Sequence, residues 1–230
     1  MKIIGLIGGM SWESSVEYYR IINEQVREKL GGLHSAKCLL YSVDFDEIEH
    51  YQAEGDWKSA GKVLAAAAFS LEKAGAEFIV ICTNTMHKVL DEIEANITIP
   101  VLHIADATAK QIKHTGIKTV GLLGTKYTME QDFYRSQIEG HGIKVVVPKK
   151  EDRDKINKVI FEELCLGKLE ASSKQYYKQV IKELVSNGAD GIILGCTEIG
   201  LLIKPEDSDV PLFDTTLIHA MEAVNHALDR

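Results

Sequence analysis

Short aliphatic runs alternate with longer amphipathic stretches along the whole chain of 230 residues. Short apolar runs between turn signals are typical of buried strands, and apolar positions repeating every three to four residues indicate helices. The pattern predicts strands at Ile3–Ile7, Lys37–Val43, Phe78–Ile81, Val101–Ile104, Val120–Leu123, Lys144–Val147, Gly191–Leu194 and Pro211–Phe213. It predicts helices at Ser14–Lys29, Trp57–Ala74, Thr85–Ala95, Ala105–Thr115, Met129–Gly140, Asp152–Gly167, Ser172–Asn187 and Thr215–Leu228. This alternation favours βαβ units and an α/β fold with mostly parallel sheets flanked by helices.

An internal repeat divides the chain into two halves. Gly75–Thr85 aligns with Gly188–Glu198, 113 residues further along. Two more segments align in the same order at offsets of 116 and 111 residues, namely Gly5–Gly9 with Gly121–Thr125 and Pro100–Leu102 with Pro211–Phe213. A repeat of this kind indicates one structural unit used twice. We therefore expect two pseudo-symmetric α/β subdomains.

Composition and charge narrow the possible partners. The chain has 26 Lys and Arg against 34 Asp and Glu, a net charge of −8, and no basic run, which argues against nucleic acid or an anionic membrane as partner. No apolar stretch approaches the roughly 20 residues that a membrane-spanning helix needs. The N-terminus lacks the pattern of a signal peptide. Four cysteines without paired metal-ligand spacing predict neither a disulfide framework nor a metal site, so we expect a cytoplasmic, reduced protein.

Equivalent polar tripeptides follow the two repeated strands. Thr83-Asn84-Thr85 follows Phe78–Ile81, and Cys196-Thr197-Glu198 follows the strand in the second half. Ligands of parallel α/β sheets bind beyond the carboxyl ends of the strands. If the halves face one another, Thr83 and Cys196 lie on opposite walls of one cleft, where two acid/base groups can invert a stereocentre. Cys82 aligns with Gly195, and a one-residue step reverses side-chain direction, so Cys82 should face the core, as should Cys38.

The sequence resembles a known family over its whole length, on the segments Gly8–Ser14 (GGMSWES), Cys82–His87 (CTNTMH), Leu123–Thr128 (LGTKYT) and Gly195–Glu198 (GCTE). The family is the cofactor-independent aspartate/glutamate racemases, and the resemblance is greatest to the branch of broad-specificity amino-acid racemases and L-aspartate/glutamate-specific racemases. It implies an isomerase that uses neither cofactor nor metal, acts on free amino acids and forms a homodimer. It also implies a first subdomain of residues 1–100 with 210–230, a second of residues 101–209, and an active site in the cleft between them.

The resemblance implies that Thr83 and Cys196 form the catalytic pair, although the two-cysteine members carry Cys-Asn-Thr where this chain has Thr83-Asn84-Thr85. A thiol has a reference pKa of about 8.5, which a helix N-terminus can lower, whereas a Thr hydroxyl is a poor base. We therefore expect Cys196 to be the main base and Thr83 a donor or relay, with His87 one helical turn later as a possible helper. The enantiomer whose α-proton faces Cys196 should react faster.

Substrate contacts are expected from both halves. The predicted contact residues, in addition to Thr83 and Cys196, are Met10, Gln52, Asn84, Thr85, Cys165 and Thr197. In aspartate-specific relatives a substrate-binding Lys aligns with Cys165, and the Tyr41–Trp57 loop here lacks the Arg that they use, with Gln52 as the candidate substitute. Backbone N–H groups after Gly8-Gly9 and Thr83-Asn84 should hold the α-carboxylate.

Two other functions remain open from the sequence. A single cleft cysteine also suits a decarboxylase or isomerase of a small carboxylic acid. An amino-acid-binding module could keep the cleft without turnover.

Overall fold

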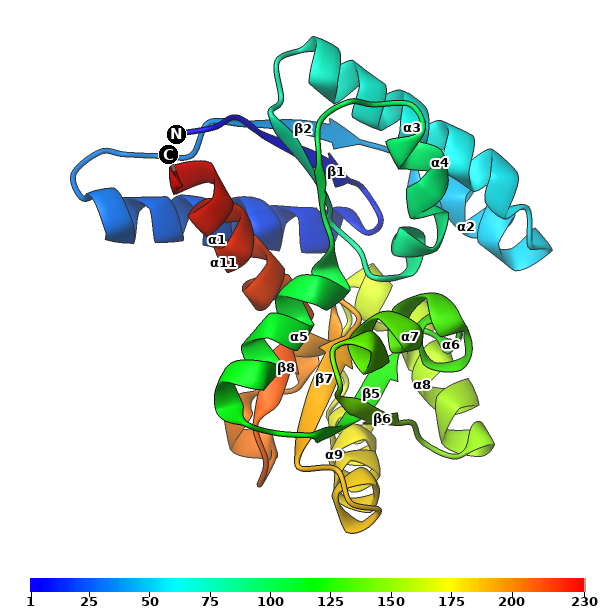
Figure 1. The fold of residues 1–230 in the computed structure, drawn as a ribbon. Helices are drawn as coiled ribbons and strands as arrows, with labels where there is room; N and C mark the ends of the chain where they lie inside the picture. The colour runs from blue at the N-terminus through cyan, green and yellow to red at the C-terminus, as the bar shows by residue number, and fades with distance from the viewer. Residues whose placement is uncertain (230) are drawn as a thin grey trace. The chain divides into compact units, whose positions relative to one another are not determined.

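The computed structural model describes residues 1–229 and contains two α/β units (Figure 1). The first unit comprises Met1–His103 and the chain from His219 onward, and the second comprises Ile104–Ile218. Each unit is built on one four-stranded parallel sheet flanked by helices, which confirms the predicted fold class. Within residues 1–229, none of the helices has the length and apolar character needed to cross a bilayer.

The sheet of the first unit has the order β2-β1-β3-β4. Its strands are β1 (Ile4–Gly8), β2 (Cys38–Ser42), β3 (Phe78–Ile81) and β4 (Val101–Leu102). The helices that precede β4 are α1 (Trp12–Leu30), α2 (Phe45–Glu54), α3 (Trp57–Lys73), the 3-10 helix η1 (Thr85–Val89) and α4 (Leu90–Glu94), and α11 (Thr215–Leu228) ends the chain.

The sheet of the second unit has the order β6-β5-β7-β8. Its strands are β5 (Thr119–Gly124), β6 (Lys144–Val146), β7 (Gly191–Gly195) and β8 (Leu212–Asp214). The helices are α5 (Ile104–Thr115), α6 (Lys126–Glu130), α7 (Asp132–Gly140), α8 (Lys150–Glu162), η2 (Leu164–Leu166), α9 (Ala171–Ser186), α10 (Ile199–Leu202) and η3 (Pro205–Asp207). All the predicted strands are present, with ends within two residues of those expected.

The two sheets have the same topology, which confirms the internal repeat. The backbone N–H of Ile79 donates to the carbonyl of Pro100 at 2.9 Å, and that of Ile192 donates to Pro211 at the same distance. The N–H groups of Glu77 and Asp190 likewise donate to Ile3 and Thr119, each at 2.9 Å. Three of the four pairs of equivalent residues lie in the aligned segments, and the fourth, Ile3 with Thr119, continues the 116-residue offset of Gly5–Gly9. Thr83 and Cys196 therefore occupy equivalent positions, two residues after β3 and one residue after β7.

Side chains of β3 alternate between the two faces of the first sheet. Phe78 and Val80, with Cys82 just after the strand, share a hydrophobic cluster with residues of α1 and α11. Ile79 and Ile81 share another cluster with residues of α2 and α3. Cys82 has no exposed surface, and burial raises the pKa of its thiol. Cys82 is thus a core residue, as its position in the repeat predicts.

Helix α2 replaces the loop expected between Tyr41 and Trp57. Asp44 caps its first turn by accepting from the N–H of Asp46, and Gly55 ends it in the left-handed conformation. Only Ile48 and Gln52 of this helix are buried. Because one of these two is polar, the apolar stripe is too short to be recognised as a helix from the sequence.

The boundaries between the two units fall at residues 103/104 and 218/219. They lie three and nine residues after the expected boundaries at 100/101 and 209/210. The reason is strand pairing. Strand β4 pairs with β3 and stays in the first sheet, and β8 pairs with β7 and stays in the second. The second boundary consequently falls inside α11.

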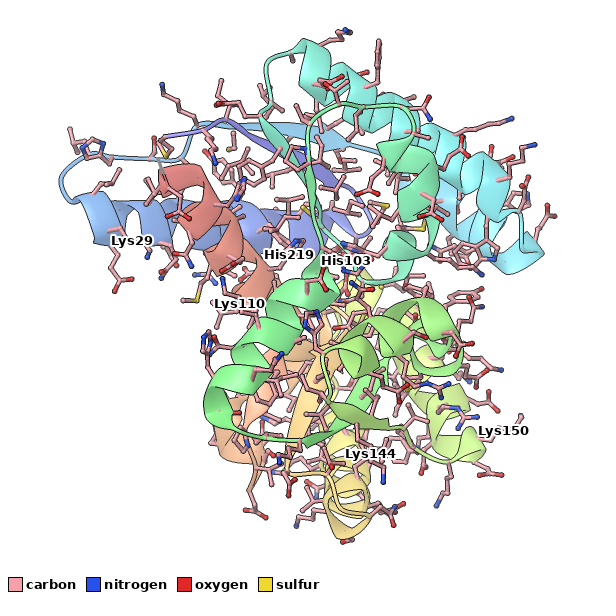
Figure 2. All side chains as sticks on the ribbon, in the orientation of Figure 1. Lys29, His103, Lys110, Lys144, Lys150 and His219 are labelled. Atoms are coloured by element: carbon pink, nitrogen blue, oxygen red, sulfur yellow. The ribbon has the colours of Figure 1, made fainter. Side chains whose placement is uncertain are left out.

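Three histidines of the first unit lie close together: the ring centroid of His87 is 4.6 Å from that of His103 and 6.0 Å from that of His219, and Figure 2 labels the last two. His87 and His219 are buried. Tyr18 Oη lies 2.9 Å from Nδ1 of His219, and Nε2 of His219 lies 2.8 Å from the carbonyl oxygen of Leu102. A carbonyl only accepts, so Nε2 carries the proton and Tyr18 donates to Nδ1. Burial lowers the pKa of His219 to about 4.

The neutral His219 predicts a loss of stability in mild acid. The unfolded chain binds this proton below about pH 6.5, but the folded chain binds it only below about pH 4, so stability is full above pH 6.5 and falls as the pH drops. Because of His219, we expect the free energy of unfolding to be about 2 kcal/mol lower at pH 5 than at pH 7.5.

Urea unfolding at the two pH values measures this difference. His219→Gln, which can make both hydrogen bonds, should reduce the pH dependence, and exposed His34→Gln should not; an unchanged slope in His219→Gln would refute the assignment.

Candidate functional site

The polar segment after β3 is fixed by its own backbone. The N–H of Thr83 donates to the carbonyl of Ile81 at 2.8 Å, and η1 begins at Thr85. Nδ1 of His87 lies 2.9 Å from the carbonyl oxygen of Thr83. Asn84, Thr85 and His87 are buried, and Thr83 is the most exposed of the three residues of the tripeptide at 9%. The turn therefore leaves Thr83 as the least covered side chain at the carboxyl end of β3.

His87 is a neutral imidazole near pH 7. Burial, followed by the neighbouring His103 and His219, holds its pKa well below the usual value. Since the Thr83 carbonyl can only accept, Nδ1 of His87 is the donor. His87 therefore supports the backbone of Thr83, and this nitrogen is not a base for the Thr83 hydroxyl.

The Gly8-Gly9 loop follows β1 at the same edge of the first sheet. Gly9 has φ of 89° and lies against the backbone of Val43, so a Cβ there would clash with that strand connection. The N–H of Gly9 donates to the Ser15 hydroxyl at 2.8 Å. This donor therefore joins the loop to the first turn of α1, and the binding of the substrate α-carboxylate by backbone N–H groups after Gly8-Gly9 stays a prediction.

Met10 and Gln52 lie within one part of the first unit. Gln52 projects from α2, is 4% exposed, and its Nε2 lies 3.1 Å from Sδ of Met86. Met10 is buried in the same hydrophobic cluster as Met86. Gln52 thus contacts η1, the helix that follows Thr83-Asn84, and Met10 belongs to the cluster that packs against it. Met86 was not among the predicted site residues, and nothing in its spacing distinguishes it from an ordinary core methionine.

Cys196 follows β7 and is 8% exposed. Its Sγ lies 2.9 Å from Oε2 of Glu198, and the hydroxyl of Thr197 lies 2.8 Å from the same oxygen. Cys165, in η2, packs partly buried against the hydrophobic cluster that contains Cys196. The second unit therefore brings together three predicted residues, Cys165, Cys196 and Thr197. The other five, Met10, Gln52, Thr83, Asn84 and Thr85, belong to the first unit.

The Cys196 thiol does not have the lowered pKa expected from a helix N-terminus. Burial, followed by the charge of Glu198 and by Cys165, raises its pKa well above the usual value. The following helix, α10, has only four residues, so its dipole is small beside an adjacent carboxylate. In this conformation Cys196 is a thiol at neutral pH.

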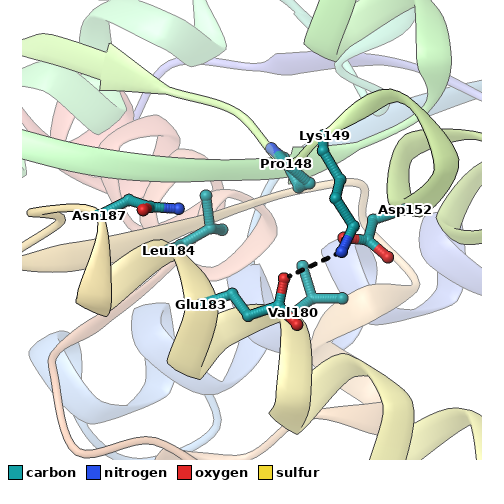
Figure 3. Close-up of a pocket in the computed structure, with 7 residues that line it drawn as sticks. All are labelled: Pro148, Lys149, Asp152, Val180, Glu183, Leu184 and Asn187. Atoms are coloured by element: carbon teal, nitrogen blue, oxygen red, sulfur yellow. Dashed lines mark ion pairs between the residues drawn. The ribbon is translucent and has the colours of Figure 1, made fainter.

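A small hollow elsewhere in the second unit contains none of the predicted site residues. Figure 3 shows its lining, which includes Pro148, Lys149, Asp152, Glu183 and Asn187. The ammonium of Lys149 lies 3.5 Å from the Glu183 carboxylate and 3.6 Å from that of Asp152, and Tyr176 donates to Asp152. The charged side chains of this hollow already pair with one another, so the hollow is a poor candidate for a substrate site. Over residues 1–229, no group of three or more His, Cys, Asp or Glu side chains is placed to hold a metal ion.

Comparisons with known proteins cover nearly the whole chain. Residues 7–223 match the family described as Asp/Glu/Hydantoin racemase. The broad specificity amino-acid racemase RacX of Bacillus subtilis (strain 168) is 25% identical over 236 residues, which cover 97% of this chain and 97% of that protein.

Two proteins of known structure are similar to this chain in both sequence and fold. A Yersinia pestis protein, whose crystal structure is described as that of a candidate Asp/Glu racemase, is 60% identical with a TM-score of 0.92, and the match covers 100% of both chains. An aspartate racemase homologue from Pyrococcus horikoshii OT3 is 40% identical with a TM-score of 0.86, also over 100% of both chains.

Proposed function

Because this chain belongs to the Asp/Glu/Hydantoin racemase family and is an isomerase, we propose that it racemises free amino acids with acidic or other polar side chains. The reaction needs no cofactor, with Cys196 as the main base and Thr83 on the opposite face of the substrate. The observation that carries the proposal is the register of the repeat, in which Thr83 and Cys196 are equivalent residues of two similar units.

The proposed reaction moves one proton at each face of the α-carbon. Cys196 first loses its thiol proton to solvent. The thiolate then takes the α-proton and becomes a thiol again, and the electron pair of the broken C–H bond passes into the substrate α-carboxylate. The Thr83 hydroxyl, as a donor or relay, delivers a solvent-derived proton to the opposite face. Polar groups of Asn84, Thr85 and Thr197 would bind the α-carboxylate, whose charge grows as the carbanion forms.

The pair is chemically unequal. A thiol ionises far more readily than an aliphatic hydroxyl, so Cys196 is the competent base even with its raised pKa. Neutral His87 supports Thr83 through its backbone carbonyl. Removal of the α-proton from the Thr83 side should consequently be the slower direction.

The residues available for the substrate side chain support a broad range of substrates. Gln52, the proposed substitute for the Arg of aspartate-specific relatives, and Cys165, which aligns with their substrate-binding Lys, are neutral here. We expect Gln52→Ala to raise the KM at least severalfold for the polar amino acids that are turned over, because a buried amide that can pair with them is lost. Steady-state kinetics over a panel of substrates measures this. An unchanged KM for every substrate would show that Gln52 does not contact them.

We propose that the protein acts as a homodimer. Trp12, Val16 and Tyr19 lie on one face of α1 and are 65%, 51% and 54% exposed, which is unusual for such large apolar side chains. A second copy of the chain covering this stripe would remove it from water. Sedimentation at micromolar concentration should give a dimer, and Tyr19→Glu should give a monomer. A monomeric wild type would refute this part of the proposal.

The four cysteines are free thiols, which supports a reducing, cytoplasmic location.

The experiment that tests the proposed function is a chiral assay of a panel of amino acids in deuterated water. A racemase inverts configuration and exchanges the α-proton for deuterium. A decarboxylase releases carbon dioxide instead, and a binding module does neither. Inversion with exchange for at least one polar amino acid is the expected result. Carbon dioxide release, or the absence of exchange across the panel with a folded protein, would overturn the proposal.

A further inference from the structure

A buried carboxylate binds the Cys196 thiol from two residues further along the chain. One oxygen of Glu198, Oε2, accepts from the thiol at 2.9 Å and from the Thr197 hydroxyl at 2.8 Å. Glu198 is 2% exposed. One carboxylate oxygen thus fixes two consecutive side chains of the candidate site, although the repeat and the spacing assign Glu198 no role.

We propose that Glu198 is the positioning residue of Cys196: its Oε2 holds the thiol in place, and its negative charge sets the pH range in which the thiol can act as a base. The inference rests on the proposed function in giving Cys196 the role of main base. Glu198 itself is not assigned any contact with the substrate.

The groups around Cys196 make Glu198 the dominant charge. Glu198 and, after it, Cys165 of η2 raise the pKa of Cys196. Tyr177 of α9 is also close, and both Cys196 and Glu163 raise its pKa. The tyrosine reference pKa of about 10 leaves the phenol uncharged near neutral pH, and burial raises the pKa of Tyr177 further. A thiolate would place a second negative charge against the Glu198 carboxylate in a site with little water, which is unfavourable. Removing that charge while keeping the acceptor oxygen should therefore ease ionisation of the thiol.

Glu198→Gln makes this change, because the amide oxygen can accept both hydrogen bonds. The readout is the rate of alkylation of Cys196 by iodoacetamide as a function of pH, with the modified peptide quantified by mass spectrometry. We expect the midpoint to fall by about one pH unit, which is roughly tenfold faster alkylation below both midpoints. The control is Glu162→Gln, an exposed carboxylate at the end of α8 that pairs with Lys158, and its midpoint should equal that of the wild type.

Turnover provides the second readout. In Glu198→Gln the pH profile of kcat/KM should move in the same direction as the alkylation midpoint. Glu198→Leu, which has no acceptor, should lower kcat more than it changes KM, and the Gln variant should recover most of kcat. If the Leu variant does not fold, the alkylation midpoints of Glu198→Gln and of the Glu162→Gln control are sufficient to test the inference.

An alkylation midpoint that is unchanged or higher in Glu198→Gln overturns the inference. Because alkylation requires no turnover, this result is independent of the proposed function. A wild type that exchanges no α-proton would instead refute the proposed function, while the alkylation profiles still judge the effect of Glu198 on the thiol.

Discussion

Cys196→Ser should lower kcat by about 10²- to 10⁴-fold, the contribution of a well-placed acid/base group. Serine is close to cysteine in shape, and its hydroxyl can donate to Glu198 Oε2 as the thiol does at 2.9 Å. The hydroxyl ionises much less readily than a thiol, so the loss should fall on the chemical step. Initial rates from each enantiomer, with kcat and KM determined separately, measure the effect.

The fold should survive the Cys196→Ser substitution. We expect the free energy of unfolding to change by less than about 1 kcal/mol, because the side chain keeps its volume and its hydrogen bond. Cys38→Ser, at a partly buried cysteine of β2, is the matched control and should leave kcat unchanged. Comparable turnover in Cys196→Ser and the wild type would remove Cys196 from the reaction.

Thr83→Cys should speed reaction of the enantiomer that the wild type handles poorly by roughly ten- to a hundredfold, because it supplies a second thiol. The repeat makes Thr83 the counterpart of Cys196, and Thr83 is the least covered residue of its tripeptide. The turn around it depends on backbone groups of Ile81 and Thr83, which the substitution leaves in place. Initial rates from each enantiomer, measured separately in the variant and the wild type, test this.

Cys82→Ala is the control for the Thr83 prediction. Cys82 is buried in the core of the first unit, so its loss should cost about 1 kcal/mol of stability and leave the ratio of the two initial rates unchanged. If Cys82→Ala abolished turnover in a folded protein while Thr83→Ala had no effect, Cys82 would be the second base.

The sequence was sufficient for the fold and for the equivalence of the two halves. Strand patterns such as Phe78–Ile81 are short, apolar and bounded by turn residues, and the matching segments Gly75–Thr85 and Gly188–Glu198 define the register without any structure. The same backbone hydrogen bonds in both units then confirm that register. The inward orientation of Cys82 follows from it directly.

Other features depend on three-dimensional packing that the local pattern does not contain. Helix α2 was expected as a loop because its buried positions include the polar Gln52. The motif shows that a helix follows Cys196, and a helix N-terminus alone predicts a lowered thiol pKa. The motif does not show the burial of the thiol or the approach of the Glu198 carboxylate to the sulfur, which raise that pKa. The hydrogen bond from the Gly9 N–H to the Ser15 hydroxyl, six residues away, likewise depends on how the loop folds back on α1.

The most direct test of the central claim, a two-sided proton transfer by Cys196 and Thr83, is the isotope content of the first product molecules. The wild type is incubated with one enantiomer of a turned-over amino acid in deuterated water, and the inverted product is separated and analysed by mass spectrometry at early times. Because the two faces use different groups, the account predicts one deuterium at the α-carbon of essentially all inverted product, and loss of that product in Cys196→Ser. Inverted product that retains the original α-proton would show a single base acting on both faces and would contradict the account.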